Sequence, residues 1–368
     1  MATVVVAPDT FKGSLAAVEV ADALARGWRS VRPRDEVVEL PLADGGEGTL
    51  DVVERLVPGA RRVSLTVAGP LGDPRGTSAL LLPDGTAVVE IAASSGLPLL
   101  TRASPLQATS RGLGETLRHM VEAGARRCLV ALGGSSSTDG GTGALSALGV
   151  QFLDGWGAVL PDGGGSLARL DQIDIGALVS APDGGVELLV DVAAPLLGGA
   201  GAATTFGPQK GAGPAEMAAL EAGLRRLADI LGGDPDRPGS GAAGGAAYGL
   251  ATVWGARISP GSTAIAELAG LPAALNRADV VITGEGRFDR TSSRGKVPGH
   301  VLTQAGERGT DAYVVCGVRD DAELPRGTHA ITLVDICGST DAAMAGAGRG
   351  LVRAGARAAR HWEGRRHV

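Results

Sequence analysis

The sequence predicts an α/β protein with two domains. Short runs of β-branched residues, bounded by glycine and proline, alternate with segments in which alanine and leucine recur at helical spacing. The chain has 368 residues, which is more than a single hydrophobic core usually spans. Apolar residues make up 44% of the chain but aromatic residues only 3%, so alanine, valine and leucine must fill the cores.

The N-terminal segment predicts a strand, a helix and a second strand. Residues 4–7 form an apolar run typical of a buried strand, and a helix follows from about Ser14. A second strand is expected at 37–40, a loop at 41–48 and a helix at 49–56. One face of the first helix carries Leu15, Val18, Ala21, Leu24 and Trp28.

The next segment changes to an extended pattern. Residues 61–92 predict strands, and the Pro-Asp-Gly sequence at 83–85 predicts a hairpin turn. We expect the chain to cross between domains near residues 70–75, and residues 232–249, rich in glycine and alanine, to form a mobile loop. Further strands are predicted at 127–132, 186–190, 279–283 and 312–316, and helices at 216–231, at 297–307 and over the last twenty or so residues.

Composition argues against several classes of partner. The formal charge of −6 and the scarcity of aromatic residues disfavour duplex and single-stranded nucleic acid, respectively. No apolar stretch is long enough to cross a bilayer, and the N-terminus lacks the features of a signal peptide. The scattered Cys128, Cys316 and Cys337 predict reduced thiols, so we expect a cytoplasmic protein.

Lysine is rare in this chain, with three lysines against thirty-one arginines. Lys12, Lys210 and Lys296 each lie beside a glycine in a predicted loop. Because arginine supplies the ordinary positive charge here, a retained lysine indicates a task that suits a compact, rotatable ammonium, such as phosphate binding. Chance is the competing explanation, since glycine fills 59 positions. We favour anion binding.

Four glycine-rich loops share one design, in which a predicted strand ends and a helix follows. At such junctions free backbone N–H groups and the helix dipole favour an anion. A single loop of this kind is usually a structural turn, but four that carry acids, two of them with lysine, predict a phosphate and metal site. The loops are residues 9–14, 43–49, 133–141 and 284–289, the last followed by Gly295 and Lys296.

Familiar nucleotide and hydrolase motifs are absent or misplaced. The sequence contains neither the G-x-x-x-x-G-K-[ST] loop nor a G-x-S-x-G elbow. A G-x-G-x-x-G match at 239–244 follows Asp-Pro-Asp-Arg-Pro rather than a strand, which argues against a dinucleotide site. The five histidines lack metal-ligand spacing, so a zinc site is not expected.

Six blocks carry a family resemblance. They are APDTFKGS at 7–14, ADGGEGT at 43–49, TSRGLGE at 109–115, FGPQKGA at 206–212, PGSGAAGG at 238–245 and GEGR at 284–287. In this order they resemble the type-one glycerate kinase family, from the first strand to about residue 300.

The resemblance implies ATP-dependent phosphorylation of D-glycerate, usually at the 2-hydroxyl, with Mg²⁺. It also implies a Rossmann-like domain made from both chain ends, expected at 1–72 plus 285–368, and a second α/β domain inserted at 73–284. The active site is expected in the cleft between these domains. The implied partners are glycerate and ATP, with neither nucleic acid nor a membrane, and a homodimer is the candidate assembly.

The resemblance and the loop chemistry together suggest roles for the cationic residues. We expect Lys12 and Lys296 to bind phosphates as catalytic residues, and Lys210 to bind phosphate or the glycerate carboxylate. Arg287 would clamp a carboxylate or phosphate with two hydrogen bonds. The rest of the substrate- and phosphate-binding pocket is expected to comprise Asp44, Gly45, Gly46, Ser135, Ser136 and Glu285.

The acidic residues divide between metal binding and proton transfer. Asp44, Glu47 and Asp191 are the candidate Mg²⁺ ligands, since Mg²⁺ prefers hard oxygens. Asp191 is our first candidate to accept the proton of the substrate hydroxyl and Asp289 the second.

The chain departs from the family pattern at three places. Thr138 replaces an asparagine, Ala193 and Ala194 replace Thr-Asn, and Thr291 replaces a glutamine. The lost amides leave open phosphorylation at the 3-hydroxyl or of a related small hydroxy acid. An NAD-dependent hydroxy-acid oxidoreductase and a non-catalytic carboxylate-binding regulator are the alternatives from other functional classes.

Overall fold

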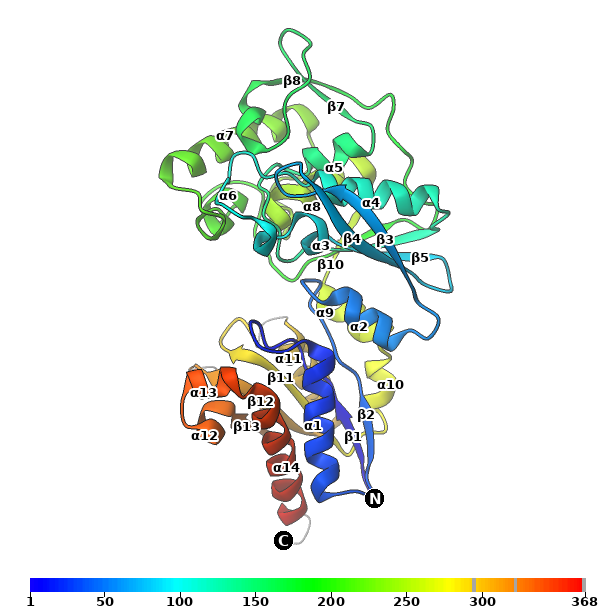
Figure 1. Ribbon diagram of the computed structural model, residues 1–368, viewed down its shortest axis with the longest axis vertical. Coiled ribbons are helices and arrows are strands. Elements are labelled where there is room, and N and C mark those ends of the chain that lie inside the picture. Colours follow the sequence, from blue (N-terminus) through cyan, green and yellow to red (C-terminus); the bar gives the residue numbers. More distant parts are fainter. Residues whose placement is uncertain (293–295, 321–322, 366–368) are drawn as a thin grey trace. The chain divides into compact units, whose positions relative to one another are not determined.

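The computed structural model describes residues 1–292, 296–320 and 323–365 of the chain (Figure 1). The chain divides into two compact units, both of α/β type as predicted. The first unit comprises Met1–Asp44, Asp51–Pro58 and Ser262–Val368, and the second comprises Gly45–Leu50 and Gly59–Gly261.

A five-stranded parallel sheet forms the centre of the first unit. In spatial order its strands are β13 (Thr328–Thr332), β12 (Asp311–Arg319), β11 (Val280–Phe288), β1 (Thr3–Val6) and β2 (Glu36–Glu39). Strand β1 lies between β11 and β2 and pairs in parallel with both. Both ends of the chain therefore contribute to one Rossmann-like sheet, which confirms the predicted fold class.

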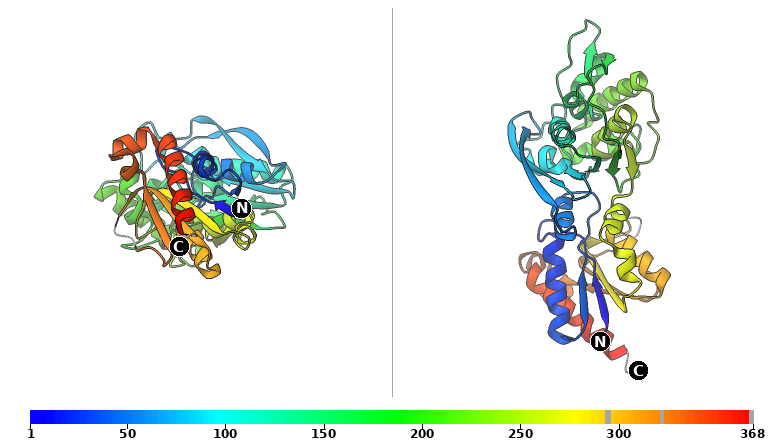
Figure 2. Two further views of the ribbon diagram at one scale, coloured as in Figure 1. Left: turned by 90° about the horizontal axis from the view of Figure 1, so that it is seen from below. Right: turned by 90° about the vertical axis from the view of Figure 1, so that its right-hand side faces the viewer.

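Helices cover both faces of this sheet (Figure 2). Helices α1 (Ala17–Val31) and α14 (Ala347–Arg365) pack against each other on one face, where the rings of Trp28 and Trp362 lie 5.8 Å apart. Helices α10 (Leu271–Leu275) and α11 (Val297–Arg308) lie on the other face. The unit also contains α9 (Gly261–Leu268), α12 (Leu333–Cys337), α13 (Thr340–Ala345) and most of α2 (Thr49–Leu56).

The second unit contains a mixed six-stranded sheet. Its order is β10 (Arg257–Ser259), β9 (Val186–Leu189), β6 (Arg127–Ala131), β5 (Thr86–Glu90), β4 (Pro74–Leu81) and β3 (Arg61–Ala68). Strands β3, β4 and β5 form an antiparallel meander, and the remaining pairs are parallel. Strands β7 (Gln151–Asp154) and β8 (Leu170–Asp174) form a separate antiparallel pair.

Ala-rich helices and short 3₁₀ turns complete the second unit. Its core uses alanine, leucine and valine, as the low aromatic content requires. The α-helices are α3 (Ile91–Ser95), α4 (Arg111–Glu122), α5 (Thr142–Ala147), α6 (Ala202–Phe206), α7 (Pro214–Leu231) and α8 (Ala246–Trp254), and the 3₁₀ turns are η1 (Leu97–Leu99), η2 (Gly164–Arg169), η3 (Pro208–Lys210) and η4 (Ala242–Gly245).

Most of the predicted elements are confirmed. The strands predicted at 127–132, 186–190, 279–283 and 312–316 correspond to β6, β9, β11 and β12, and the helices at 216–231 and 297–307 correspond to α7 and α11. The turn at 83–85 joins β4 to β5, as expected. In the part of the chain that the structure describes, no helix is both long and apolar enough to span a membrane.

Two local expectations were wrong. Residues 70–75 are not a crossover, because β3 and β4 pair from Arg61↔Leu81 to Ala68↔Pro74 and residues 69–73 are the turn between them. The segment 232–249 is not an open loop, since it is buried from Gly239 onward and enters α8 at Ala246. The contact-based units also differ from the expected domain limits, because β3 pairs within the second sheet and β11 within the first.

Candidate functional site

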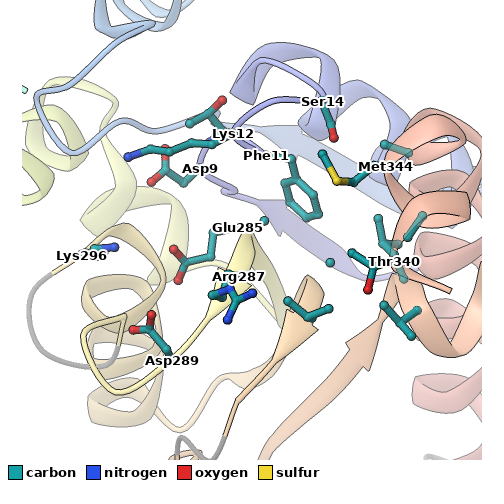
Figure 3. Close-up of a pocket in the computed structure, with 18 of the residues that line it drawn as sticks. Asp9, Phe11, Lys12, Ser14, Glu285, Arg287, Asp289, Lys296, Thr340 and Met344 are labelled. Atoms are coloured by element: carbon teal, nitrogen blue, oxygen red, sulfur yellow. The ribbon is translucent and has the colours of Figure 1, made fainter. Parts of the chain in front are cut away.

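The topology of the first sheet creates a natural ligand position. From β1 the chain continues to β2 on one side, whereas β11, β12 and β13 follow one another on the opposite side. Ligands of open parallel sheets bind outside the carboxyl ends of the strands where this direction reverses. A cavity of about 320 Å³ lies there, lined by the loop after β1, the end of β11 and helices α12 and α13 (Figure 3). Six of the predicted site residues line it: Lys12, Asp44, Glu285, Arg287, Asp289 and Lys296.

Four carboxyl groups line this cavity, those of Asp9, Asp44, Glu285 and Asp289. Asp9 follows β1, and its backbone N–H donates to the Gly284 carbonyl at 2.8 Å, which holds the loop against β11. Burial, and then the neighbouring Asp44 carboxylate, raises the pKa of Asp9 well above its usual value. Burial likewise raises the pKa of Glu285, whose Oε1 atom is buried without a hydrogen-bond partner among the described residues. The carboxyl groups therefore form a site that favours a cation or shared protons.

Cationic side chains surround these acids (Figure 3). Lys12 is exposed in the loop after β1, and Lys296 is the N-cap residue of the twelve-residue helix α11. Arg287, on β11, pairs with Asp320 at 3.1 Å but remains largely exposed. The cavity therefore combines two ammonium groups, a guanidinium and the N-terminal end of a helix, which together suit an anion. Gly295, named with Lys296 in the sequence argument, lies outside the described residues.

Asp289 has a local structural role in the loop before α11. Its Oδ1 atom accepts hydrogen bonds from the backbone N–H and the hydroxyl of Thr291, at 2.7 and 2.6 Å. The Thr291 hydroxyl is the main cause that lowers the pKa of Asp289. A carboxylate held in this way is a weaker proton acceptor than a free one. Thr291, one of the departures from the family pattern, therefore shapes this loop.

In the second unit, the blocks at 109–115, 206–212 and 238–245 meet around the loop at 133–141, against which Lys210 lies. Its ammonium is buried and donates to Ser135 Oγ at 3.2 Å and to the Ser137 carbonyl, with Thr138 Oγ1 at 3.5 Å. Burial lowers the pKa of Lys210 to about 8. Asp139 accepts from the Ser110 N–H and hydroxyl, both at 2.8 Å. The block at 238–245 joins through the Gly140 N–H, which donates to the Gly244 carbonyl at 3.0 Å.

The other predicted residues of the second unit lie in two loops. The Gly133 N–H donates to the Gly45 carbonyl at 2.9 Å, so the loops that carry Gly46 and Ser135 approach closely. Ser136 donates its hydroxyl to the Ser95 carbonyl at 2.8 Å. Glu47, in the loop of Gly45 and Gly46, is exposed. Elsewhere in this unit, Asp191 Oδ1 accepts a hydrogen bond from the Gly261 N–H at 2.7 Å.

The predicted metal ligands are divided between the two units. Asp44 belongs to the first unit, whereas Glu47 and Asp191 belong to the second. Across residues 1–292, 296–320 and 323–365, no group of three or more histidine, cysteine or acidic side chains is arranged to hold a metal ion. Mg²⁺ binding therefore stays a prediction.

Some residues that line the cavity were not among the predicted site residues. Asp9 belongs to the first block and follows strand β1, and a carboxylate at that position is a recognisable sign of a ligand site. The α12 and α13 residues Val334, Thr340 and Met344 line the cavity but carry no recognisable motif. The G-x-G-x-x-G match at 239–244 follows helix α7 rather than a strand, in line with the argument against a dinucleotide site.

Comparisons with known proteins agree with this architecture. The model of the Glycerate kinase family matches residues 4–363. The chain is 40% identical over 304 residues to a glycerate kinase of Bacillus subtilis (80% of this chain, 79% of the relative). It is 37% identical over 364 residues to a glycerate 2-kinase of Escherichia coli, with 95% of each chain covered.

A solved structure covers the whole chain. It is a protein from Salmonella typhimurium LT2 assigned as glycerate kinase 2, with 35% identity, a TM-score of 0.85 and 100% of both chains covered. The match of the family model over nearly the full length, together with relatives well above 30% identity, leads to one conclusion. The chain belongs to the glycerate kinase family, and the Bacillus subtilis and Escherichia coli relatives are named glycerate kinase and glycerate 2-kinase.

Proposed function

We propose that this protein transfers the γ-phosphoryl group of ATP to the 2-hydroxyl of D-glycerate, giving 2-phosphoglycerate and ADP. The observation that carries the proposal is the cavity at the end of β1 and β11, where two lysines, an arginine and four carboxyl groups meet in a member of the glycerate kinase family. The name of the Escherichia coli relative, glycerate 2-kinase, supports the choice of hydroxyl.

Positioning and charge neutralisation supply most of the catalysis in phosphoryl transfer. Lys12 and Lys296 are suited to bind the β- and γ-phosphates, because a flexible ammonium can follow the moving phosphoryl group. Arg287 is suited to a two-point contact with a phosphate or carboxylate. Lys12 lies in the loop after β1, Arg287 at the end of β11 and Lys296 at the start of α11. All three line one cavity, so a phosphate chain can contact them together.

The acids of the same cavity suit one or two contacts to a magnesium ion that substrate phosphates also hold. Asp9, Asp44 and Glu285 offer hard oxygens, and the buried Glu285 Oε1 has no hydrogen-bond partner among the described residues. Magnesium is commonly held by one or two carboxylates together with substrate phosphates rather than by protein alone. When bound, it would neutralise negative charge on the β- and γ-phosphates.

The proton acceptor remains a proposal with two candidates. Asp191 is the first, and its Oδ1 accepts a hydrogen bond from the Gly261 N–H at 2.7 Å. Asp289 is the second, but its lowered pKa and its hydrogen bonds within the loop make it the weaker base. Exchange of each for asparagine should separate them, because loss of the base lowers kcat with little change in ATP affinity.

Proton-coupled phosphorus NMR tests the activity and the product together. The protein is incubated with MgATP and D-glycerate, with L-glycerate, glycolate and chelated magnesium as parallel reactions. A phosphate ester at C2 couples to one proton and gives a doublet, whereas an ester at C3 couples to two and gives a triplet. A doublet is the expected result. A triplet would move the product to 3-phosphoglycerate, and no ATP consumption with any acid would refute the kinase assignment.

A further inference from the structure

The cavity of the first unit has two chemically different halves (Figure 3). Lys12, Asp9, Glu285 and Lys296 gather in one half, which we call the charged half. The other half, called the apolar half, is lined by Phe11, Val318, Leu333, Val334, Ala343 and Met344. These side chains come from the loop after β1, the end of β12, α12 and α13.

The apolar half is a built surface rather than a gap between helices. Phe11 is 3% exposed and Ala343 4%, so they form a fixed wall packed into the core of the unit. Met344 is 53% exposed and lies beside the cavity, where its flexible thioether can adapt to a bound group. The Thr340 hydroxyl, at the first turn of α13, is a polar group at the same wall.

The chemistry of the reactants determines which group fits there. Glycerate carries a carboxylate and two hydroxyls on three carbons, so it has no apolar face to bury. The phosphates and the ribose are also polar. Only the nucleobase offers a flat ring system that gains free energy when it packs against an aromatic ring and a thioether. A cavity of about 320 Å³ is also larger than glycerate needs and falls in the range of small-molecule sites.

We propose that the apolar half is the nucleobase subsite, in which the base packs among Phe11, Val334 and Met344 while the phosphates extend to Lys12 and Lys296. This rests on the proposed function, because it assumes that a nucleotide is the phosphoryl donor. It assigns α12 and α13, which carry none of the sequence blocks, to donor binding. It also fixes the orientation of the donor, with the γ-phosphate at the end of β11.

Met344 gives the sharpest test, because an exposed side chain can be changed without disturbing the core. Met344→Asp places a carboxylate against the base, and Met344→Leu keeps an apolar side chain. Ala345→Asp is the matched control, since Ala345 is exposed on the same last turn of α13 but does not line the cavity. The measurements are the Kd of ADP by calorimetry, the KM values of ATP and D-glycerate, and the inhibition constant of tripolyphosphate.

The expected pattern separates the base from the phosphates. Met344→Asp should raise the Kd of ADP and the KM of ATP by about tenfold or more, whereas Met344→Leu and Ala345→Asp should change them by less than about threefold. The KM of glycerate and the inhibition constant of tripolyphosphate should stay within about twofold in all three variants. Lys12→Ala should instead raise the inhibition constant of tripolyphosphate, because Lys12 is proposed to bind the phosphates.

The outcomes that overturn the proposal are distinct from those that overturn the function. If the wild type phosphorylates glycerate but Met344→Asp binds ADP normally, the subsite is wrong and the kinase assignment stands. If Met344→Asp weakens tripolyphosphate as much as ADP, or raises the KM of glycerate instead, the apolar half does not hold the base. If the wild type neither binds ADP nor consumes ATP, the proposed function fails and the subsite fails with it.

Discussion

The ammonium nitrogen of Lys210 lies 3.2 Å from the hydroxyl oxygen of Ser135, beneath a loop in which Ser137 and Asp139 are fully buried. The two residues are far apart in sequence, and Lys210 itself is only 3% exposed. A buried ammonium loses its hydration, and hydrogen bonds to Ser135 and the Ser137 carbonyl replace part of it. Lys210 therefore fixes the shape of this loop, whatever ligand the loop holds.

Substitution of Lys210 by methionine should change how stability depends on pH. The pKa of Lys210 is lowered to about 8, so between pH 8 and about 10.4 the folded protein binds fewer protons at this site than the unfolded chain. Stability from this group therefore rises with pH across that window, by about 3 kcal/mol in total. The unfolding free energy of the wild type minus that of Lys210→Met should therefore become more positive as the pH rises. Urea unfolding at pH 7.5, 9 and 10 measures this difference.

Other groups that titrate at high pH do not affect the comparison of the wild type with Lys210→Met. Cys128 and Cys316 also titrate at high pH, since burial raises the pKa of each to about 12, but both proteins contain them. Their contributions cancel in the difference. A difference that stays constant from pH 7.5 to 10 would mean that Lys210 titrates normally and is not held as a buried ammonium.

Lys12→Ala and Lys296→Ala should each lower turnover by roughly a hundredfold or more, because each ammonium is expected to face charge that develops in the transition state. Lys12 is exposed and Lys296 half-buried, so both variants should fold normally by circular dichroism. Arg26→Ala is a suitable control, since Arg26 is an exposed residue of α1 that pairs with the exposed Asp22. Normal turnover in both lysine variants would end the phosphate assignment.

The sequence predicted the loops of the first unit better than its full cavity. Lys12, Glu285 and Lys296 could be found because glycine and charged residues mark the ends of parallel strands, where strand topology brings them together. Met344 and Val334 could not, because an apolar residue on a short helix has the same sequence pattern whether it faces a core or a ligand. Their role depends on which helix packs over the sheet end, and that is decided by tertiary contacts.

In the second unit, too, tertiary contacts decided features that the sequence pattern could not predict. Residues 232–249 looked like a loop because glycine is common there, yet Ala243 and Gly244 are buried against the loop of Thr138. Glycine served here to allow backbones to approach, which composition alone does not distinguish from flexibility. The burial of Lys210 could not be read from the sequence either, because its ammonium contacts Ser135, Ser137 and Thr138, which are distant from it in the chain.

Asp35→Asn should destabilise the first unit by about 2–4 kcal/mol. Asp35 is buried and accepts from the Ala2 N–H at 3.0 Å, from Trp28 Nε1 at 3.1 Å and from Arg32 Nε at 2.5 Å. Burial opposes its ionisation, but these hydrogen bonds outweigh burial and lower the pKa of Asp35 below its usual value. Urea unfolding at pH 7 measures the loss.

The pH dependence of the unfolding free energy provides a second test of Asp35. Because the folded pKa is depressed, the contribution of Asp35 is present above the ordinary pKa of about 3.9 and disappears as the pH falls through the folded value. The gap between wild type and Asp35→Asn should therefore narrow below about pH 4. Asp22→Asn, which removes an exposed pair at 3.2 Å, should cost no more than about 0.5 kcal/mol at any pH. An equal effect in the two variants would contradict the buried network.

Gly45→Ala should destabilise the second unit more than Gly48→Ala does. Both glycines have a positive φ, 84° and 91°, so either alanine meets backbone strain of about 1–2 kcal/mol. A Cβ on Gly48 would have open space around it, whereas a Cβ on Gly45 would lie 2.7 Å from the Cβ of the buried Leu189 on β9. Overpacking of this kind typically adds about 1–3 kcal/mol. Urea unfolding of the two variants isolates that packing contribution, and equal unfolding free energies would show that the Gly45 loop can move away from β9.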